Sequence, residues 1–341
     1  MQDMLPFFAD AAHPYGLAIA VASFLLLLLM GAIGYRRGLP VGTARVFGIL
    51  AIPLGVIFSR LVFCLFNLPL FLETYENPWL MLRFFDGGLS MCGLLIGLLL
   101  AASLTARLLR LSLGKLLDVL TLPLGLFVAI CRAAEGLTEL GVGKVIEEGF
   151  WTQHFPWLFL TESAGIATEY RLAVYRYEAL AGLLLFAFMA CLARSLRKDR
   201  GARNGDSALL FFSLYGATQM ILESMRDDGH MLIIFLRVSQ VLAALMPVVA
   251  AAIFTKRYIT LLGRAGPRII LSWGALLACI IAGILLEFSL DGRLSWGNPS
   301  LQRDYAIMVV LCVILFAIPY SLFHTLRKKR YGKNHITVRM P

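Results

Sequence analysis

Two arginines, Arg60 and Arg132, lie inside long apolar stretches of the chain. An ionised guanidinium within the hydrocarbon of a membrane costs roughly 3 kcal/mol or more unless it faces protein, water or an anion. Each arginine could snorkel to the membrane surface or pair with a carboxylate, which is a purely structural role. The other chemistry open to two such cations is the binding of a negatively charged group within the membrane.

The composition indicates that a membrane is the solvent for most of the chain. Its residues are 59% hydrophobic and 15% charged, whereas soluble domains are about 45–50% apolar and about 25% charged. The net charge of +10 does not indicate nucleic-acid binding, because the basic residues form short clusters between the apolar runs. Such clusters are typical of topology signals, so we expect an integral membrane protein without a nucleic-acid partner.

The chain lacks the motifs of soluble enzymes, including a P-loop, a dinucleotide glycine fingerprint, GxSxG and HExxH. Its cysteines are scattered singly through apolar segments, without a CxxC motif. They are Cys64, Cys92, Cys131, Cys191, Cys279 and Cys312. We therefore expect neither disulfides, nor a metal site, nor a cofactor.

Apolar runs long enough to cross about 30 Å of hydrocarbon predict about nine transmembrane helices in an all-α, polytopic bundle. The runs cover roughly residues 16–34, 44–66, 88–106, 116–134, 178–195, 207–225, 233–255, 268–287 and 305–326. Pro123 and Gly125 are expected to interrupt the fourth run. Basic residues follow runs one, three, five and seven and fill the C-terminal tail. The positive-inside rule therefore predicts an outer N-terminus and a cytoplasmic C-terminus.

The longest hydrophilic insertion, residues 135–177, mixes carboxylates with aromatic side chains such as Trp151 and Trp157. This mixture suits a small outer cap anchored at the membrane interface. An irregular loop with aromatics in the headgroup layer is equally compatible with the sequence.

Short strings near the ends of the runs carry the more specific information. Residues 86–97 read DGGLSMCGLLIG, and Arg132 and Gly143 follow in the next segment. Tyr15-Gly16-Leu17 opens the first run, and Ser59-Arg60 lies in the second. Tyr177-Glu178 opens the fifth run. Tyr215-Gly216, Glu223 and Arg226 end the sixth, and Gln240 follows.

In order and spacing these strings resemble the bacterial prolipoprotein diacylglyceryl transferases over roughly residues 13–257. Residues 86–97 correspond to that family's GGxSxHGGLIG, and Arg132 falls on the arginine of its GRxGNFxNGExxG. The stretch from Tyr215 to Arg226 corresponds to its YGxxRxxxExxR. The resemblance implies a transferase-like domain over residues 1–257, followed by two extra helices and a basic tail over residues 258–341.

The resemblance also implies a reaction and a location. Phosphatidylglycerol donates its diacylglyceryl group to the thiol of a lipobox cysteine in a preprolipoprotein, and glycerol phosphate leaves. The protein would be a multi-pass protein of the bacterial plasma (inner) membrane. Catalytic roles are implied for Arg132, Cys92 and Glu223. Substrate contacts are implied for Tyr15, Arg60, Gly88, Gly93, Gly143, Gln219 and Arg226.

The chain departs from the family at positions that matter for this chemistry. Cys92 replaces the family's histidine, Gln219 replaces an arginine, and LAVY replaces HPxQ before Tyr177. Gln219 removes a full charge and a bidentate phosphate contact. Glu135 replaces an asparagine and is expected to pair with Arg132 and neutralise it. Whether the chain is an active enzyme therefore stays open.

Other interpretations remain beside the transferase. Glu223 and Arg226, three residues apart, could simply pair with each other. The chain could be a non-catalytic paralogue that binds anionic phospholipid headgroups or a membrane partner. A small-solute transporter is a third possibility, although neither an inverted repeat nor paired broken helices are evident.

Overall fold

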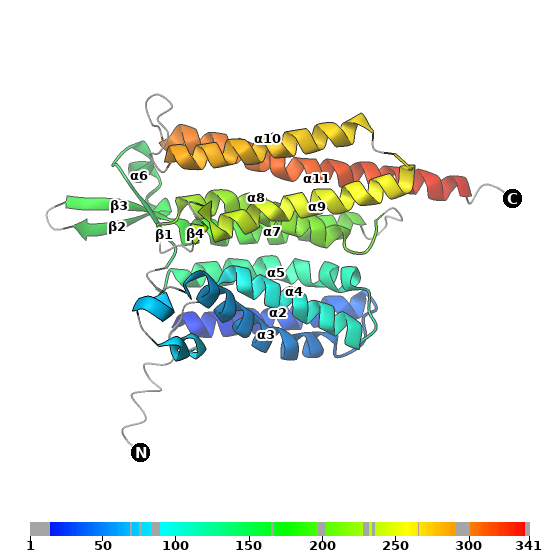
Figure 1. Ribbon diagram of the computed structural model, residues 1–341, viewed down its shortest axis with the longest axis horizontal. Coiled ribbons are helices and arrows are strands. Elements are labelled where there is room, and N and C mark those ends of the chain that lie inside the picture. The colour runs from blue at the N-terminus through cyan, green and yellow to red at the C-terminus, as the bar shows by residue number, and fades with distance from the viewer. Residues whose placement is uncertain are drawn as a thin grey trace, which may run out of the picture. The chain divides into compact units, whose positions relative to one another are not determined.

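The computed structural model describes residues 14–68, 70–74, 77–83, 89–138, 140–164, 167–196, 202–227, 232–233, 236–264, 266–290 and 301–337. Long helices make up most of these residues (Figure 1). They are α2 (Pro14–Arg36), α3 (Thr43–Phe66), α4 (Met91–Leu108), α5 (Leu113–Glu135), α7 (Val174–Leu196), α8 (Asp206–Met225), α9 (Val238–Leu262), α10 (Pro267–Leu290) and α11 (Leu301–Thr337).

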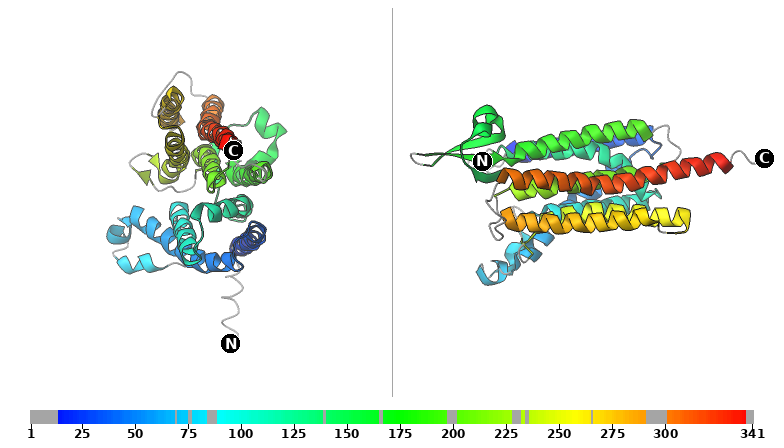
Figure 2. Two further views of the ribbon diagram at one scale, coloured as in Figure 1. Left: turned by 90° about the vertical axis from the view of Figure 1, so that its right-hand side faces the viewer. Right: turned by 90° about the horizontal axis from the view of Figure 1, so that it is seen from above.

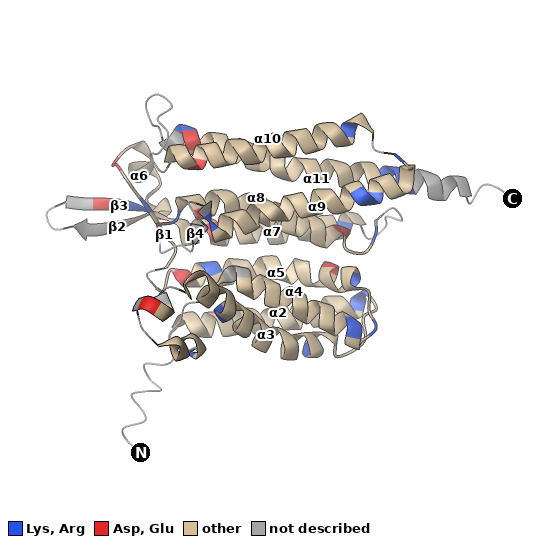
Figure 3. Cartoon of the chain, in the orientation of Figure 1, with Lys and Arg blue, Asp and Glu red and all other residues tan. Residues whose placement is uncertain are grey.

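The prediction of an all-α, polytopic membrane protein is confirmed. Within the described residues, 8 helices are long and apolar enough to cross a membrane, and the apolar part of α4, Gly93–Leu108, is shorter. Each predicted run corresponds to one of the long helices. Basic residues lie at helix ends, for example Arg36 in the last turn of α2 and Arg107 in the last turn of α4 (Figure 3). The side of the membrane on which each terminus lies stays a prediction.

The expected interruption of the fourth run is wrong. Helix α5 is continuous from Leu113 to Glu135 with Pro123 inside it. Proline removes one hydrogen bond of a helix without ending it when neighbouring helices cover the freed carbonyl. Gly125 serves a different purpose, because a Cβ there would lie 2.8 Å from the backbone nitrogen of Phe186 on α7.

The chain divides into two compact units. The first comprises residues 1–190 and 225–235, and the second comprises residues 191–224 and 236–341. Figure 2 gives two further views of the helices. The boundary expected after residue 257 stays a prediction.

Close helix contacts at glycines organise the first unit. A Cβ on Gly93 of α4 would lie 2.1 Å from the carbonyl oxygen of Phe58 on α3, and one on Gly97 would lie 2.4 Å from that of Leu54. This spacing of small residues lets two backbones touch. Helix α2 packs against α5 in the same unit. Two short helices, η2 (Leu70–Thr74) and η3 (Pro78–Leu82), follow α3.

Residues 142–173 form a small antiparallel sheet, so this part of the insertion is not an irregular loop. Its strands are β1 (Val142–Ile146), β2 (Phe159–Ala164) and β3 (Ala167–Ala173), in the order β1-β3-β2. The short helices α6 (Phe150–His154) and η5 (Pro156–Leu158) connect β1 to β2. Phe159, Leu172 and Val174 form a small apolar core. The hydroxyl of Tyr177 donates to the carbonyl of Leu158 at 2.6 Å and ties the sheet to α7.

The second unit contains α8, α9, α10 and α11. A Cβ on Gly216 of α8 would lie 2.3 Å from the carbonyl oxygen of Ala243 on α9, so these helices also touch through backbone. Buried Asp206 on α8 accepts hydrogen bonds from Arg257 on α9 and, at 3.2 Å, from Arg330 on α11. The two-residue strands β4 (Leu232–Ile233) and β5 (Leu236–Arg237) precede α9.

Candidate functional site

Four charged side chains form a buried cluster in the first unit: Arg132, Glu135, Glu178 and Arg226. Nη1 of Arg132 lies 2.5 Å from Oε1 of Glu135, and its Nε lies 3.5 Å from Oε2 of Glu178. Nη1 of Arg226 donates to Oε2 of Glu178 at 2.8 Å and to Oε2 of Glu135 at 3.1 Å. Each of the four residues is less than 10% exposed, and Glu178 is fully buried.

The cluster combines two guanidinium groups with two carboxylates, so its formal charge sums to zero. Charge-assisted hydrogen bonds of this kind are strong, but they recover a large desolvation cost only when every charge keeps a partner. Guanidinium groups also bind phosphate through paired N–H donors. A phosphate entering this cluster would therefore compete with the carboxylates for the same donors.

Close packing of α5 and α7 brings three members of the cluster together. A Cβ on Gly182 of α7 would lie 2.7 Å from the backbone nitrogen of Ala129 on α5. Glu178 lies one helical turn before Gly182, and Arg132 lies about one turn after Ala129. Because the helices are antiparallel at this contact, Glu178 meets Arg132 and Glu135 at the ends of α5 and α7 closest to the sheet.

Arg226 reaches the cluster through the sheet. Helix α8 ends at Met225, and Arg226 forms an antiparallel bridge with Gly143 of β1. The backbone nitrogen of Asp227 donates to the carbonyl of Val142 at 3.0 Å. A Cβ on Gly143 would lie 2.7 Å from the carbonyl oxygen of Met225. Gly143, predicted as a substrate contact, therefore has the observed role of admitting the backbone that carries Arg226.

Two further residues border the cluster. Gly141 adopts a φ of +73°, and a Cβ there would lie 2.9 Å from Oε2 of Glu135. Tyr15, half-buried at the start of α2, lies within electrostatic reach of Glu135, Arg132 and Arg226. The structure thus brings Tyr15 and Arg132 to one place, as expected from their motifs.

Arg60 occupies different surroundings in the first unit. Its Nε donates to the carbonyl of Met81 at 3.0 Å, and its Nη2 donates to that of Leu80 at 2.8 Å. The guanidinium also lies 5.7 Å from the ring centre of Phe63 and 5.6 Å from that of Phe71. These contacts satisfy the charge at the end of η3, which is the structural role that the sequence left open.

The glycine-rich stretch before α4 has a packing role where it is described. Gly93 lies against the backbone of Phe58, and Ser90 accepts a hydrogen bond from the backbone nitrogen of Gly93 at 3.4 Å. Gly88 lies outside the described residues. Cys92 belongs to the first turn of α4, and its side chain is likewise outside the description.

Two predicted residues, Gln219 and Glu223, lie buried on α8 in the second unit. The carbonyl of Glu223 accepts a hydrogen bond from Arg237. The described partners of Arg226 are Glu135 and Glu178, and its pairing with Glu223 stays a prediction. The helix ends before Arg226, so the side-chain geometry of residues three apart on a helix does not apply.

Glu178 is the cluster member to which the sequence analysis assigns no role. It ends a Tyr-Glu string at the start of an apolar run. A carboxylate at that position carries the same cost as the two arginines, because it too precedes a long stretch without charges. This desolvation cost is the sequence feature that predicts a buried ion pair between Glu178 and a cation such as Arg132.

Comparisons with known proteins identify the family of this chain. A family model described as prolipoprotein diacylglyceryl transferase matches residues 6–256. A phosphatidylglycerol–prolipoprotein diacylglyceryl transferase of Bacillus licheniformis is 27% identical over 248 residues, covering 72% of this chain and 88% of the relative. Proteins of the same name from Limosilactobacillus reuteri and Listeria innocua are 26% and 27% identical, covering 72% and 71% of this chain and 86% and 84% of the relatives. The chain therefore belongs to the prolipoprotein diacylglyceryl transferase family.

Proposed function

We propose that this protein transfers the diacylglyceryl group of phosphatidylglycerol to the thiol of a lipobox cysteine in a preprolipoprotein. The observation that supports this proposal is the buried cluster, in which Arg132 and Arg226 each form ion pairs with both Glu135 and Glu178. Both arginines fall on motif positions of the family. Because both substrates are carried by the bacterial plasma membrane, we propose that membrane as its location.

The chemistry assigns definite tasks to the site. The cysteine sulfur forms a bond to the terminal glyceryl carbon, the bond from that carbon to the phosphate oxygen breaks, and glycerol phosphate leaves with the electron pair. Arg132 and Arg226 would stabilise the negative charge on the leaving phosphate in a water-poor site. The thiol must lose its proton, and the bases within the described cluster are the carboxylates of Glu135 and Glu178.

The transfer can be tested directly. Purified full-length protein would be given phosphatidylglycerol and a lipobox peptide, and the thioether-linked lipopeptide would be measured by mass spectrometry. Arg132→Ala should lower the rate by about 100-fold or more, as expected for loss of a transition-state charge contact. Arg45→Ala is the matched control, because Arg45 is exposed at the start of α3. Equal rates for Arg132→Ala and the intact protein would contradict the proposal.

A second candidate function, a non-catalytic protein that binds anionic phospholipid headgroups, is favoured by one observation. Glu135 stands where the family has asparagine, and it holds Arg132 at 2.5 Å. Glu135→Asn would leave two arginines facing a single carboxylate. If the chain is an enzyme whose rate is limited by the pairing of Glu135 with Arg132, we expect Glu135→Asn to raise the transfer rate. The expected increase is about tenfold, which corresponds to the free energy of one modest charge-assisted hydrogen bond.

The binding-only alternative predicts a different pair of results. Intact protein would retain phosphatidylglycerol through purification without forming lipopeptide. Glu135→Asn would then increase the retained phospholipid and still give no product, as measured by lipid extraction and mass spectrometry. Restoring the family residues through Cys92→His and Gln219→Arg would show whether lost motif positions explain the lack of turnover.

A further inference from the structure

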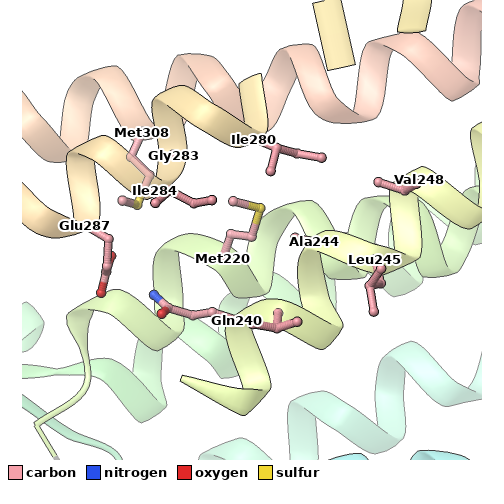
Figure 4. Close-up of a pocket in the computed structure, with 11 residues that line it drawn as sticks. Met220, Gln240, Ala244, Leu245, Val248, Ile280, Gly283, Ile284, Glu287 and Met308 are labelled. Atoms are coloured by element: carbon pink, nitrogen blue, oxygen red, sulfur yellow. The ribbon is translucent and has the colours of Figure 1, made fainter. Parts of the chain in front are cut away.

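The second unit contains a cavity of about 200 Å³ bounded by side chains of α8, α9, α10 and α11. Figure 4 shows its lining, with the carboxyl of Glu287 and the amide of Gln240 at one end. The remaining lining is apolar and includes Met220, Val248 and Ile280. Glu287 and Ile280 lie on α10, beyond the residues matched by the family model.

Glu287 has an unusual environment for a carboxyl on an apolar helix. It is 6% exposed, and its buried Oε2 has no hydrogen-bond partner among the described residues. Buried ionisable groups in membrane helices ordinarily pair with one another or face a ligand pathway. Asp206 and Asp304, the buried aspartates described in this unit, each have arginine partners. Glu287 thus faces a cavity whose described lining contains no cationic side chain.

The lining residues give the cavity a polar end near the ends of α9 and α10 and an apolar end deeper along the helices. Glu287 lies three residues before the end of α10, and Gln240 lies two residues after the start of α9. The polar end therefore lies near helix ends, where the membrane surface is expected. Ile280 lies seven residues deeper on α10, which corresponds to about 10 Å along the helix axis. A polar head near the surface and an apolar chain directed inward match this arrangement.

We infer that this cavity binds an amphiphile with one apolar chain and a protonated amine head group. The ammonium group would donate hydrogen bonds to Oε2 of Glu287 and to the amide oxygen of Gln240, while the chain contacts Met220 and Ile280. An anionic phosphate would be repelled by the carboxylate, and a neutral alcohol would leave its charge uncompensated. A transmembrane helix, about 10 Å across, is too wide for the space. This site is independent of the proposed transfer reaction.

The test is the binding of radiolabelled decylamine to the full chain in phosphatidylcholine nanodiscs, with empty nanodiscs subtracted. We expect saturable binding of one decylamine per chain, which a tenfold excess of decanol does not displace. Glu287→Gln keeps the shape of the side chain and removes its charge, so it should weaken binding by at least tenfold. Arg132→Ala should bind decylamine normally, which separates this site from the proposed transfer site.

A pair of glycine variants on α10 tests the location. A Cβ on Gly283 would lie 3.3 Å from Cε of Met220, so Gly283→Leu should fill the cavity and abolish saturable binding. Gly274 has nothing within 4 Å of its Cβ position and is exposed, so Gly274→Leu should leave binding unchanged. Displacement by decanol, unchanged affinity in Glu287→Gln, or equal effects of the two glycine variants would each overturn the inference.

Discussion

Glu178 and Glu287 are both buried carboxyls on long apolar helices, but their surroundings differ. Glu178 accepts from Arg226 at 2.8 Å and lies 3.5 Å from Arg132, within the segment that matches the family. Glu287 faces an apolar cavity without a cation among the described residues, and it lies in the helices that follow that segment. One carboxyl completes a network, whereas Oε2 of the other has no hydrogen-bond partner in the described part of the chain.

This difference in surroundings predicts how each carboxyl contributes to the stability of the folded protein. A buried charge inside a network is costly to remove, because the charges left behind lose their compensation. A buried charge without a partner already carries a desolvation cost, so its removal should relieve the protein. Stability measurements on matched substitutions can therefore separate the two cases without any knowledge of the substrates.

The largest expected effect is that of Glu178→Ala. This variant leaves Arg132 and Arg226 with a single shared carboxylate, Glu135, and should destabilise the protein by about 3–5 kcal/mol. The measurement is reversible unfolding in mixed micelles of mild detergent and sodium dodecyl sulfate. Glu169→Ala is the control, because Glu169 on β3 is 42% exposed and lies 4.0 Å from Arg171.

The control should change stability by less than about 1 kcal/mol, as is usual for surface ion pairs. The double variant Glu178→Ala with Arg226→Ala should cost less than the sum of the single variants, because each change removes the other's unpaired charge. Strictly additive losses would show that the four side chains do not act as one network.

The sequence predicts the long helices and part of the charged cluster, because the free-energy costs behind these predictions depend on residues close together in the chain. The apolar runs predict the long helices, and the expense of a charge within them identifies Arg132 as a functional or structural centre. The replacement of asparagine by Glu135 correctly predicts the pairing with Arg132. Each of these inferences depends on residues close together in the chain.

The rest of the site depends on contacts between distant segments. The described partners of Arg226 are 91 and 48 positions away in the sequence. The sheet of residues 142–173 places Arg226 through Gly143, and the register of its strands cannot be derived from the sequence pattern. Arg60 likewise donates hydrogen bonds to carbonyls of η3. The position of η3 depends on the path of the chain between α3 and α4. None of these pairings has a short-range signal.

An intermediate effect is expected for Gly143→Ala, which changes no charge in the cluster. The added methyl group would lie 2.7 Å from the carbonyl oxygen of Met225, so the strand carrying Arg226 must move. We expect a loss of about 1–3 kcal/mol, typical of overpacking. Gly149→Ala, in the same insertion, is the control because nothing lies within 4 Å of its Cβ position. If both variants unfold alike, the close approach at Gly143 does not position Arg226.

The smallest expected effect is that of Glu287→Leu. Leucine has a similar volume and would face the apolar lining of the cavity without a desolvated charge, so stability should stay the same or rise by about 1 kcal/mol. The same unfolding measurement compares it with Glu178→Leu, which should still lose most of the 3–5 kcal/mol expected for a broken network. A large loss in Glu287→Leu would mean that this carboxyl is compensated in the folded protein. The contrast between a paired and an unpaired buried carboxyl would then disappear, and with it the reason to expect a cationic ligand at α10.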